Sequence, residues 1–243
     1  MYIELPKENM VICNGMAEVK DGMLYVYGSA LSDIMFELTY IFDGITCYYC
    51  NNPLTEQAEN IPEPFRKRTI DHLIPRDFGG PSITNNLRPC CLDCNSKKGN
   101  MFPEEFELWG KIKKIEPEKE RRKEMRAFKE ELKQIREQRR YGEIPSLPNE
   151  WMSEGVPKSA YVYFYTEEPV GAAFDKAKEF YRKYRRIQRP LIFSKNGFLL
   201  DGFNTLLYIK YTGVTRVHSI ILDNVIYAGF NEYNESNALV IKK

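Results

Sequence analysis

Two C-x-x-C pairs constrain this chain more than any other feature of its sequence. Cys47 and Cys50 form the first pair, Cys91 and Cys94 form the second, and 40 residues lie between the pairs. Four thiolates suit tetrahedral Zn²⁺, and a set of four sulfur ligands leaves no open position for a substrate. The sequence therefore predicts a structural zinc ion that ties the two ends of this loop together. The alternative is a group of reduced, buried cysteines.

The remaining sequence argues against disulfides. The first residues, MYIELPKENM, have an acidic residue and a proline where a secretion signal needs a basic start and an apolar core. No apolar run approaches the ~18 residues that a membrane span requires. We therefore expect a cytoplasmic protein, in which disulfides are disfavoured. Cys13 and Cys90 are then buried or spare thiols.

Length and charge bound the function only loosely. A chain of 243 residues with 43% hydrophobic and 28% charged residues is long enough for two modest folded domains. The net charge of +1 gives no global argument for nucleic-acid binding. Any such argument rests on where the charges lie.

The loop between the cysteine pairs contains an Asp-His dipeptide, at Asp71 and His72, within DHLIPRDFGG, and it continues into NNLRPCCLDCNSKKGN. This pattern of D-H-x-x-P, Gly-Gly, N-L and C-x-x-C-N-x-x-K-G resembles the HNH nuclease family, whose core is the ββα-metal fold, framed by zinc in many members. His72 and Asn86 stand at the first two positions that name the family. Asn95 stands at the third. Family members of this kind are found in bacteria and phages.

The resemblance implies a metal-dependent DNA endonuclease. Phosphodiester hydrolysis needs an activated water and positive charge near the phosphoryl oxygens. His72 is expected to be the general base, since a histidine is mostly unprotonated at neutral pH. Asp71 and Asn95 offer hard oxygen ligands that suit Mg²⁺ or a similar divalent ion. Asn86 is expected to fix the Gly-Gly loop, so that a loop carbonyl orients His72.

Basic residues around the motif are candidates for phosphate contacts. Alternatively, these side chains are ordinary surface charges that contact solvent and no phosphate. The alternative for the whole constellation is a zinc-stapled nucleic-acid-binding or adaptor protein that cuts nothing, with His72 as a capping or packing residue. The candidate phosphate-binding residues of the motif are Arg66, Arg68, Lys97 and Lys98.

Alternation and turn signals predict an α+β fold in four segments. Residues 1–45 read as a structural arm, and 46–110 as the motif module with strands over 68–75 and 87–91 and a helix after Cys94. Residues 111–149 read as a charged spacer helix and linker, and 150–243 as a C-terminal α+β module. The pattern of residues 34–42 fits either a short helix or a strand.

A charged helix is predicted from Pro117 to Tyr141. Its only apolar side chains at regular spacing form a narrow stripe. The stripe packs on a neighbouring helix of the same chain, or it forms a coiled-coil homodimer or contacts a partner protein. Met125, Phe128, Leu132 and Ile135 make up this stripe.

The C-terminal module resembles the ParB/sulfiredoxin-like fold through its strand pair ending in Asp201-Gly202 and the helix that follows. Thr205 stands where that fold has a phosphate-gripping arginine, which argues against nucleotide binding; a nucleotide-binding switch is a third hypothesis for the protein. The predicted helix over 172–190 carries seven basic and two acidic residues. We expect it to dock DNA through Arg182, Arg185 and Arg186, unless its aromatic side chains simply pack in the core.

Overall fold

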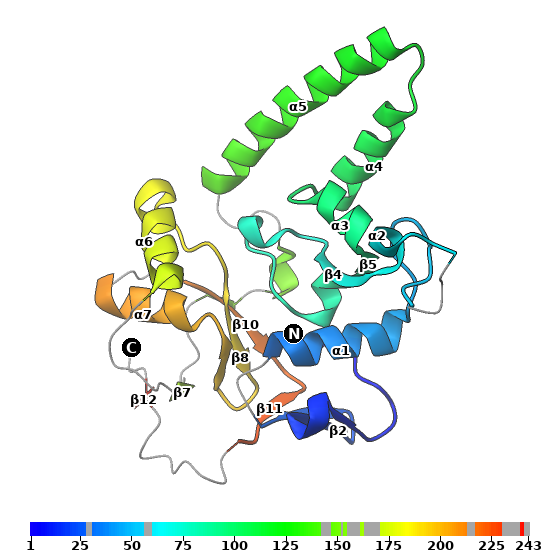
Figure 1. Ribbon diagram of the computed structural model, residues 1–243. Coiled ribbons are helices and arrows are strands. Elements are labelled where there is room, and N and C mark those ends of the chain that lie inside the picture. Colours follow the sequence, from blue (N-terminus) through cyan, green and yellow to red (C-terminus); the bar gives the residue numbers. More distant parts are fainter. Residues whose placement is uncertain are drawn as a thin grey trace.

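The structure is a computed structural model that describes residues 1–27, 31–55, 60–141, 147–151, 153–154, 161–162, 171–212, 217–229 and 239–240. It has the α+β architecture that the sequence predicts. Its main elements are two four-stranded sheets, the two-stranded hairpin of β4 (Arg68–His72) and β5 (Leu87–Cys91), and a pair of long helices (Figure 1).

The first sheet joins the two ends of the sequence. Its strand order is β1-β2-β3-β11, and β11 runs parallel to β3 although about 200 residues separate them. Asn224, directly before β11, accepts through its backbone carbonyl from the N–H of Leu24 in β3 (2.9 Å), and its side-chain amide ties down the N-terminal segment by donating to the carbonyl of Ile3 (2.7 Å) and accepting from the Ile3 N–H (3.1 Å). The strands are β1 (Met10–Ile12), β2 (Ala17–Lys20), β3 (Met23–Val26) and β11 (Val225–Tyr227).

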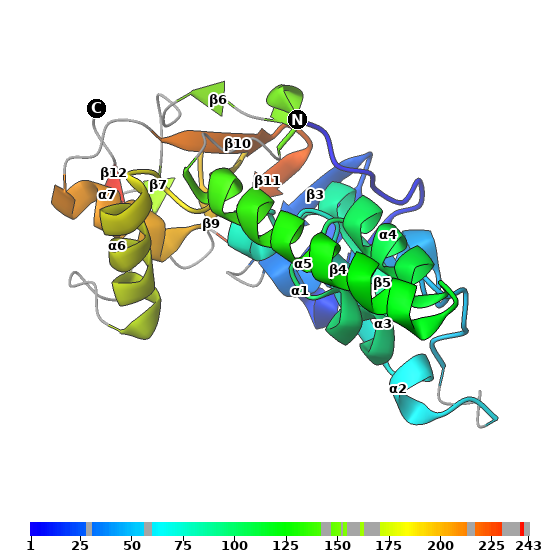
Figure 2. The ribbon, with the colours of Figure 1, turned by 90° about the horizontal axis from the view of Figure 1, so that it is seen from above.

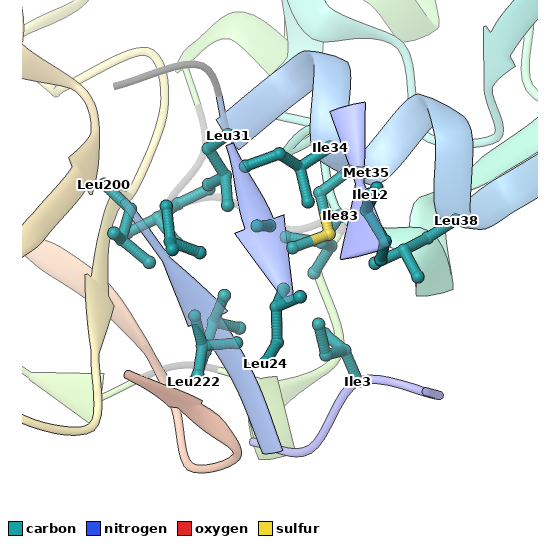
Figure 3. Packing of buried hydrophobic residues seen from close by; sticks show 14 of the residues in the cluster. Ile3, Ile12, Leu24, Leu31, Ile34, Met35, Leu38, Ile83, Leu200 and Leu222 are labelled. Atoms are coloured by element: carbon teal, nitrogen blue, oxygen red, sulfur yellow. The ribbon is translucent and has the colours of Figure 1, made fainter. Parts of the chain in front are cut away.

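Helix α1 (Leu31–Asp43) resolves the open choice for 34–42 as a helix. Its apolar face covers the first sheet and forms one core with side chains from the motif module and from the C-terminal strands. Figure 3 shows Ile34, Met35 and Leu38 of α1 above Leu24, with Leu200 and Leu222 closing the core from the C-terminal side. The predicted domain boundaries at residues 45, 110 and 149 stay predictions. The first sheet and the core around α1 together contain residues from both sides of each boundary.

The motif module is a hairpin followed by a helix, as predicted, but the first strand ends at His72 and not at 75, and the helix begins at Leu92, before Cys94. Strands β4 (Arg68–His72) and β5 (Leu87–Cys91) are antiparallel, and α3 (Leu92–Lys98) begins directly after Cys91. The short helix α2 (Glu63–Arg66) precedes β4. Two 3₁₀ turns, Arg76–Phe78 and Thr84–Asn86, shape the long loop between the strands.

Helices α4 (Pro103–Lys113) and α5 (Glu118–Tyr141) form a hairpin that projects from the rest of the molecule (Figure 1). The predicted stripe on α5 packs within this hairpin: Phe128 and Leu132 are buried against Met101 and Ile112. The stripe is therefore used inside the chain, as the packed-helix alternative requires, and it does not present a face for a coiled coil.

The second sheet has the order β6-β10-β8-β9, with β10 parallel to β8 and antiparallel to β6. Its strands are β6 (Ser153–Glu154), β8 (Leu191–Ser194), β9 (Leu199–Asp201) and β10 (His218–Leu222), and the accompanying elements are α6 (Ala172–Tyr184), α7 (Phe203–Thr212), β7 (Tyr161–Val162) and β12 (Leu239–Val240).

Two expectations for the C-terminal module need comment. The predicted helix over 172–190 ends at Tyr184, because Arg185 takes a left-handed conformation (φ 58°) and donates to the carbonyl of Tyr181. The sequence over 160–166, AYVYFYT, predicts a strand, of which only 161–162 are described. Gly142 and Pro145, which are expected to end the charged helix, lie outside the described residues. No described helix has the length and apolar character of a membrane span.

Candidate active site

The four predicted zinc ligands come together. Cys47 and Cys50 lie on the turn before the hairpin, Cys91 ends β5, and Cys94 lies in the first turn of α3. Their sulfur atoms all lie within 4.8 Å of one another. The Cys50 and Cys91 sulfurs are 3.8 Å apart, and a tetrahedron with Zn–S bonds of about 2.3 Å has an edge of about 3.8 Å. The donor set therefore fits zinc.

Hydrogen-bond donors point at this cluster. The Cys90 thiol, followed by the backbone N–H groups of Cys91, Cys50 and Tyr49, lowers the pKa of Cys47 to about 4, against the opposing effect of burial. The N–H of Cys94 donates to the Cys91 sulfur (3.3 Å). Such donors stabilise the thiolate of Cys47, which is the form that zinc binds, whereas burial raises the pKa of Cys91 to about 11 and also raises that of Cys94. Cys90 thus supports the cluster from a buried position.

Asp71 lies at the centre of a buried hydrogen-bond network. Its carboxylate accepts from the hydroxyl of Tyr49 (2.6 Å) and from the ammonium of Lys98 (3.1 Å). The side chains of Lys98 and Asp71 are 0% and 4% exposed, and Lys98 also donates to the backbone carbonyl of His72 (3.0 Å). Burial raises the pKa of Asp71, and Lys98 and Tyr49 counter that rise. Lys98, a predicted phosphate contact, is thus an internal counter-ion.

His72 follows Asp71 on β4 and lies partly exposed. Its Nε2 is 3.0 Å from the hydroxyl of Ser82, and its ring meets Phe36 edge-on. Burial and then the positive charges of Arg76, Arg189 and Lys98 lower the pKa of His72 to about 4. The imidazole is consequently neutral at physiological pH. Its partner on Nε2 is a side-chain hydroxyl, whereas we expected a loop carbonyl.

Asn86 holds the loop that carries Ser82. Its amide accepts from the N–H of Ile74 (2.8 Å) and donates to the carbonyls of Ile74 (3.1 Å) and Pro81 (3.0 Å). Gly80 makes this packing feasible, because a Cβ there would lie 1.8 Å from the Ile74 carbonyl oxygen. The loop therefore presents Ser82 to His72 from a fixed position.

Asn95 lies on α3, one turn before Lys98, and faces β4. Its amide nitrogen donates to the hydroxyl of Thr69 (3.1 Å) and to the carbonyl of Ile70 (3.2 Å). Because the amide nitrogen of Asn95 points at β4, its Oδ1 faces away from the strand. Among the described residues, no hydrogen bond is donated to its Oδ1, which leaves that oxygen available as a ligand.

The other predicted phosphate contacts of the motif lie around the hairpin. Lys97 is exposed on α3 and pairs with Asp93 (2.7 Å). Arg68 is exposed at the start of β4, with its guanidinium 4.4 Å from the centre of the Tyr40 ring. Arg66 ends α2 and is partly buried.

The three predicted arginines of the C-terminal module differ in placement. Arg182 and Arg185 are exposed. Arg186 is turned inward, and its guanidinium donates to the carbonyls of Arg139 and Arg140 at the end of α5 (2.9 Å each). Arg186 therefore connects α5 to the C-terminal module. Of the helix's aromatic side chains, Tyr181 packs on Tyr208 and Tyr184 packs on Tyr141.

A comparison with protein-family models gives a match to this module. Residues 47–108 match the HNH endonuclease family. This HNH module makes up about a quarter of the chain and contains all four cysteines together with Asp71, His72, Asn86 and Asn95. Searches of curated proteins and of solved structures gave no match. The ParB-like resemblance of the C-terminal module thus stays a prediction.

Sequence patterns did not single out several residues of the site. Tyr49 sits inside the first C-x-x-C and Ser82 inside the loop, where their spacing carries no separate signal. Arg76 belongs to the quoted motif, but its charge beside His72 follows from the loop's fold. Arg189 is one of the seven basic residues of the predicted helix over 172–190, and no sequence signal connects it to His72, more than 100 positions away.

Proposed function

We propose that the HNH module is the catalytic part of a metal-dependent endonuclease that hydrolyses phosphodiester bonds in DNA. The observation that carries this proposal is the state of His72, a neutral imidazole held by Ser82 in a site bordered by three cationic side chains. A neutral imidazole accepts a proton, and the surrounding positive charge favours a substrate phosphate over a cationic or neutral ligand.

The hydrogen bond to Ser82 assigns a role to each ring nitrogen of His72. When Nε2–H donates to the serine hydroxyl, Nδ1 carries the lone pair. Among the described residues, no hydrogen bond occupies Nδ1. This nitrogen would take the proton from the attacking water. Ser82 would act on orientation only, because its hydroxyl, which can donate or accept, holds the ring at Nε2.

Two side chains of the site have the chemistry to hold a divalent ion. Asn95 offers Oδ1, and the Asp71 carboxylate has about four lone-pair sites, of which two accept hydrogen bonds from Tyr49 and Lys98. Hard oxygen donors of this kind suit Mg²⁺. When bound, the ion would neutralise charge on the phosphate. Lys98 donates to the same carboxylate, and its positive charge would reduce the negative charge that Asp71 presents to the ion.

The runner-up is a zinc-stapled protein that binds nucleic acid or another protein without cutting. Its support is the buried Asp71–Lys98 pair, which could serve the fold alone. The two proposals differ in one requirement: cutting needs an exchangeable divalent ion, while binding needs only the structural zinc.

The test is incubation of the zinc-replete protein with supercoiled plasmid and with single-stranded DNA. One set of samples contains Mg²⁺, and the other contains a chelator too weak to remove the zinc. We expect nicking or linearisation with Mg²⁺ only. DNA binding without cutting under every metal condition would contradict the nuclease and favour the binding protein.

A further inference from the structure

The C-terminal module reaches the HNH module through the end of α5. Arg139, in the last turn of α5, stacks on the ring of Phe102 with 3.9 Å between the guanidinium carbon and the ring centre. The same side chain pairs with Glu105 (2.6 Å) and lies 5.8 Å from the centre of Phe78. Phe78 belongs to the loop between β4 and β5. The end of α5 is therefore anchored to the loop that borders His72.

The segment after α6 attaches to this anchor. Arg186 binds the carbonyls of Arg139 and Arg140, and Ile187, directly after it, is buried. Figures 1 and 2 both show the end of α5 next to α6. From the other side, β8 begins at the fully buried Leu191. The short stretch between Ile187 and Leu191 is thus fixed at both ends, beside the HNH loop.

Arg189 lies in this fixed stretch, within electrostatic range of the active site. It is partly buried, and it acts electrostatically on both His72 and Arg76. The carboxylates of Asp77 and Asp201 attract it, but no described carboxylate lies within ion-pair distance of Arg189 or Arg76. Two like charges in a partly buried site repel each other, and an anion between them would remove that cost.

We propose that Arg189 binds a phosphate of the nucleic-acid substrate beside His72, so that the C-terminal module supplies one side of the active site. The inference rests on the proposed nuclease function and deepens it. A guanidinium suits this role because its planar N–H groups bind phosphate in a bidentate manner. The C-terminal module would then act on the chemistry directly, in addition to any docking by the exposed arginines of α6.

The test compares Arg189→Gln, Arg189→Lys and the charge-matched control Arg126→Gln, which alters an exposed arginine on α5. The first readout is the single-turnover cleavage rate of plasmid at saturating protein. We expect the rate of Arg189→Gln to fall about 10²-fold, that of Arg189→Lys to recover part of the loss, and that of Arg126→Gln to match the parent. Equal zinc content and melting temperature exclude a folding defect.

The second readout does not depend on cleavage. In a His72→Ala background, the affinity for a fluorescent DNA duplex is measured over a range of salt concentrations. Loss of one phosphate contact makes the negative slope of log K against log salt shallower by about 0.9, and we expect this for Arg189→Gln but not for Arg126→Gln. An unchanged value of either readout overturns the inference. If the parent protein does not cleave, the nuclease proposal fails, and the salt slope alone decides the role of Arg189.

Discussion

Replacing Lys98 with methionine tests the buried network beneath the active site. Methionine keeps the length and the apolar stem of the lysine, but it removes the ammonium that pairs with Asp71 and with the His72 carbonyl. Both side chains of the pair are almost fully buried. The substitution therefore leaves a carboxylate inside the protein without a cationic partner, held by the hydroxyl of Tyr49 and the backbone N–H of His72.

Removing one partner of a buried ion pair costs about 3–5 kcal/mol. For a chain of this size, each kcal/mol lowers the melting temperature by about 2–4 °C, so we expect a fall of roughly 6–20 °C. The neighbouring lysine is a matched control. Lys97 also pairs with an aspartate, but its side chain is 47% exposed, and exposed pairs contribute about 0–1 kcal/mol. Lys97→Met should therefore melt within about 4 °C of the parent.

The loss in Lys98→Met should also depend on pH. Burial raises the pKa of Asp71 and Lys98 opposes that rise, so the variant's carboxyl has a pKa well above the unfolded value of about 3.9. A raised folded pKa stabilises the protein below the unfolded pKa, and this stability is lost as the pH rises through the folded pKa. Thermal melts of zinc-replete protein at pH 5 and pH 8 would measure this. Equal melting of the two lysine variants, or a deficit that shrinks with rising pH, would refute the role of the pair.

Three further predictions follow from the site. Cys94→Ser should lose the one bound zinc per chain and unfold the HNH module, whereas Cys13→Ser, outside the cluster, should keep it; metal analysis of both variants decides this. Gly80→Ala should lower the melting temperature by at least about 2 °C, since its Cβ would overlap the Ile74 carbonyl. Gly110→Ala has open space around its Cβ and should not destabilise the protein, so equal melting temperatures of the two variants would contradict the packing at Gly80. Because burial and nearby cations lower the pKa of His72 to about 4, log kcat/KM should stay level from about pH 7 down to about pH 5, and a fall centred near about 6.5 would contradict the assignment.

Local sequence signals predicted the HNH module well. The cysteine spacing, the Asp-His dipeptide and the turn residues of the loop act within about 50 positions of one another, and each has a direct structural consequence. The order of hairpin and helix and the cysteine cluster are as these signals predict, while the first strand is shorter and the helix begins three residues earlier than predicted. The stripe on α5 was also predictable, and its partner on α4 is a close neighbour in sequence.

Contacts between distant segments were not predictable in the same way. Pairing of β3 with β11 depends on the whole fold, and a short apolar strand carries no record of its partner. The buried position of Lys98 has a similar cause, because a lysine in a polar run is normally exposed and only the carboxylate of Asp71 makes its burial favourable. The end of α6 at Arg185 was missed because arginine is not a usual left-handed residue.

The chain's two histidines provide the most direct test of the central proposal. His72 lies in the site, and His218 lies on β10 in the second sheet. Plasmid nicking with Mg²⁺ should be compared for the parent, His72→Ala and His218→Ala, each loaded with zinc. Loss of a general base lowers the rate by about 10²–10⁴-fold, so we predict that His72→Ala loses nicking and that His218→Ala retains it. Nicking by His72→Ala at the parent's rate would contradict the account.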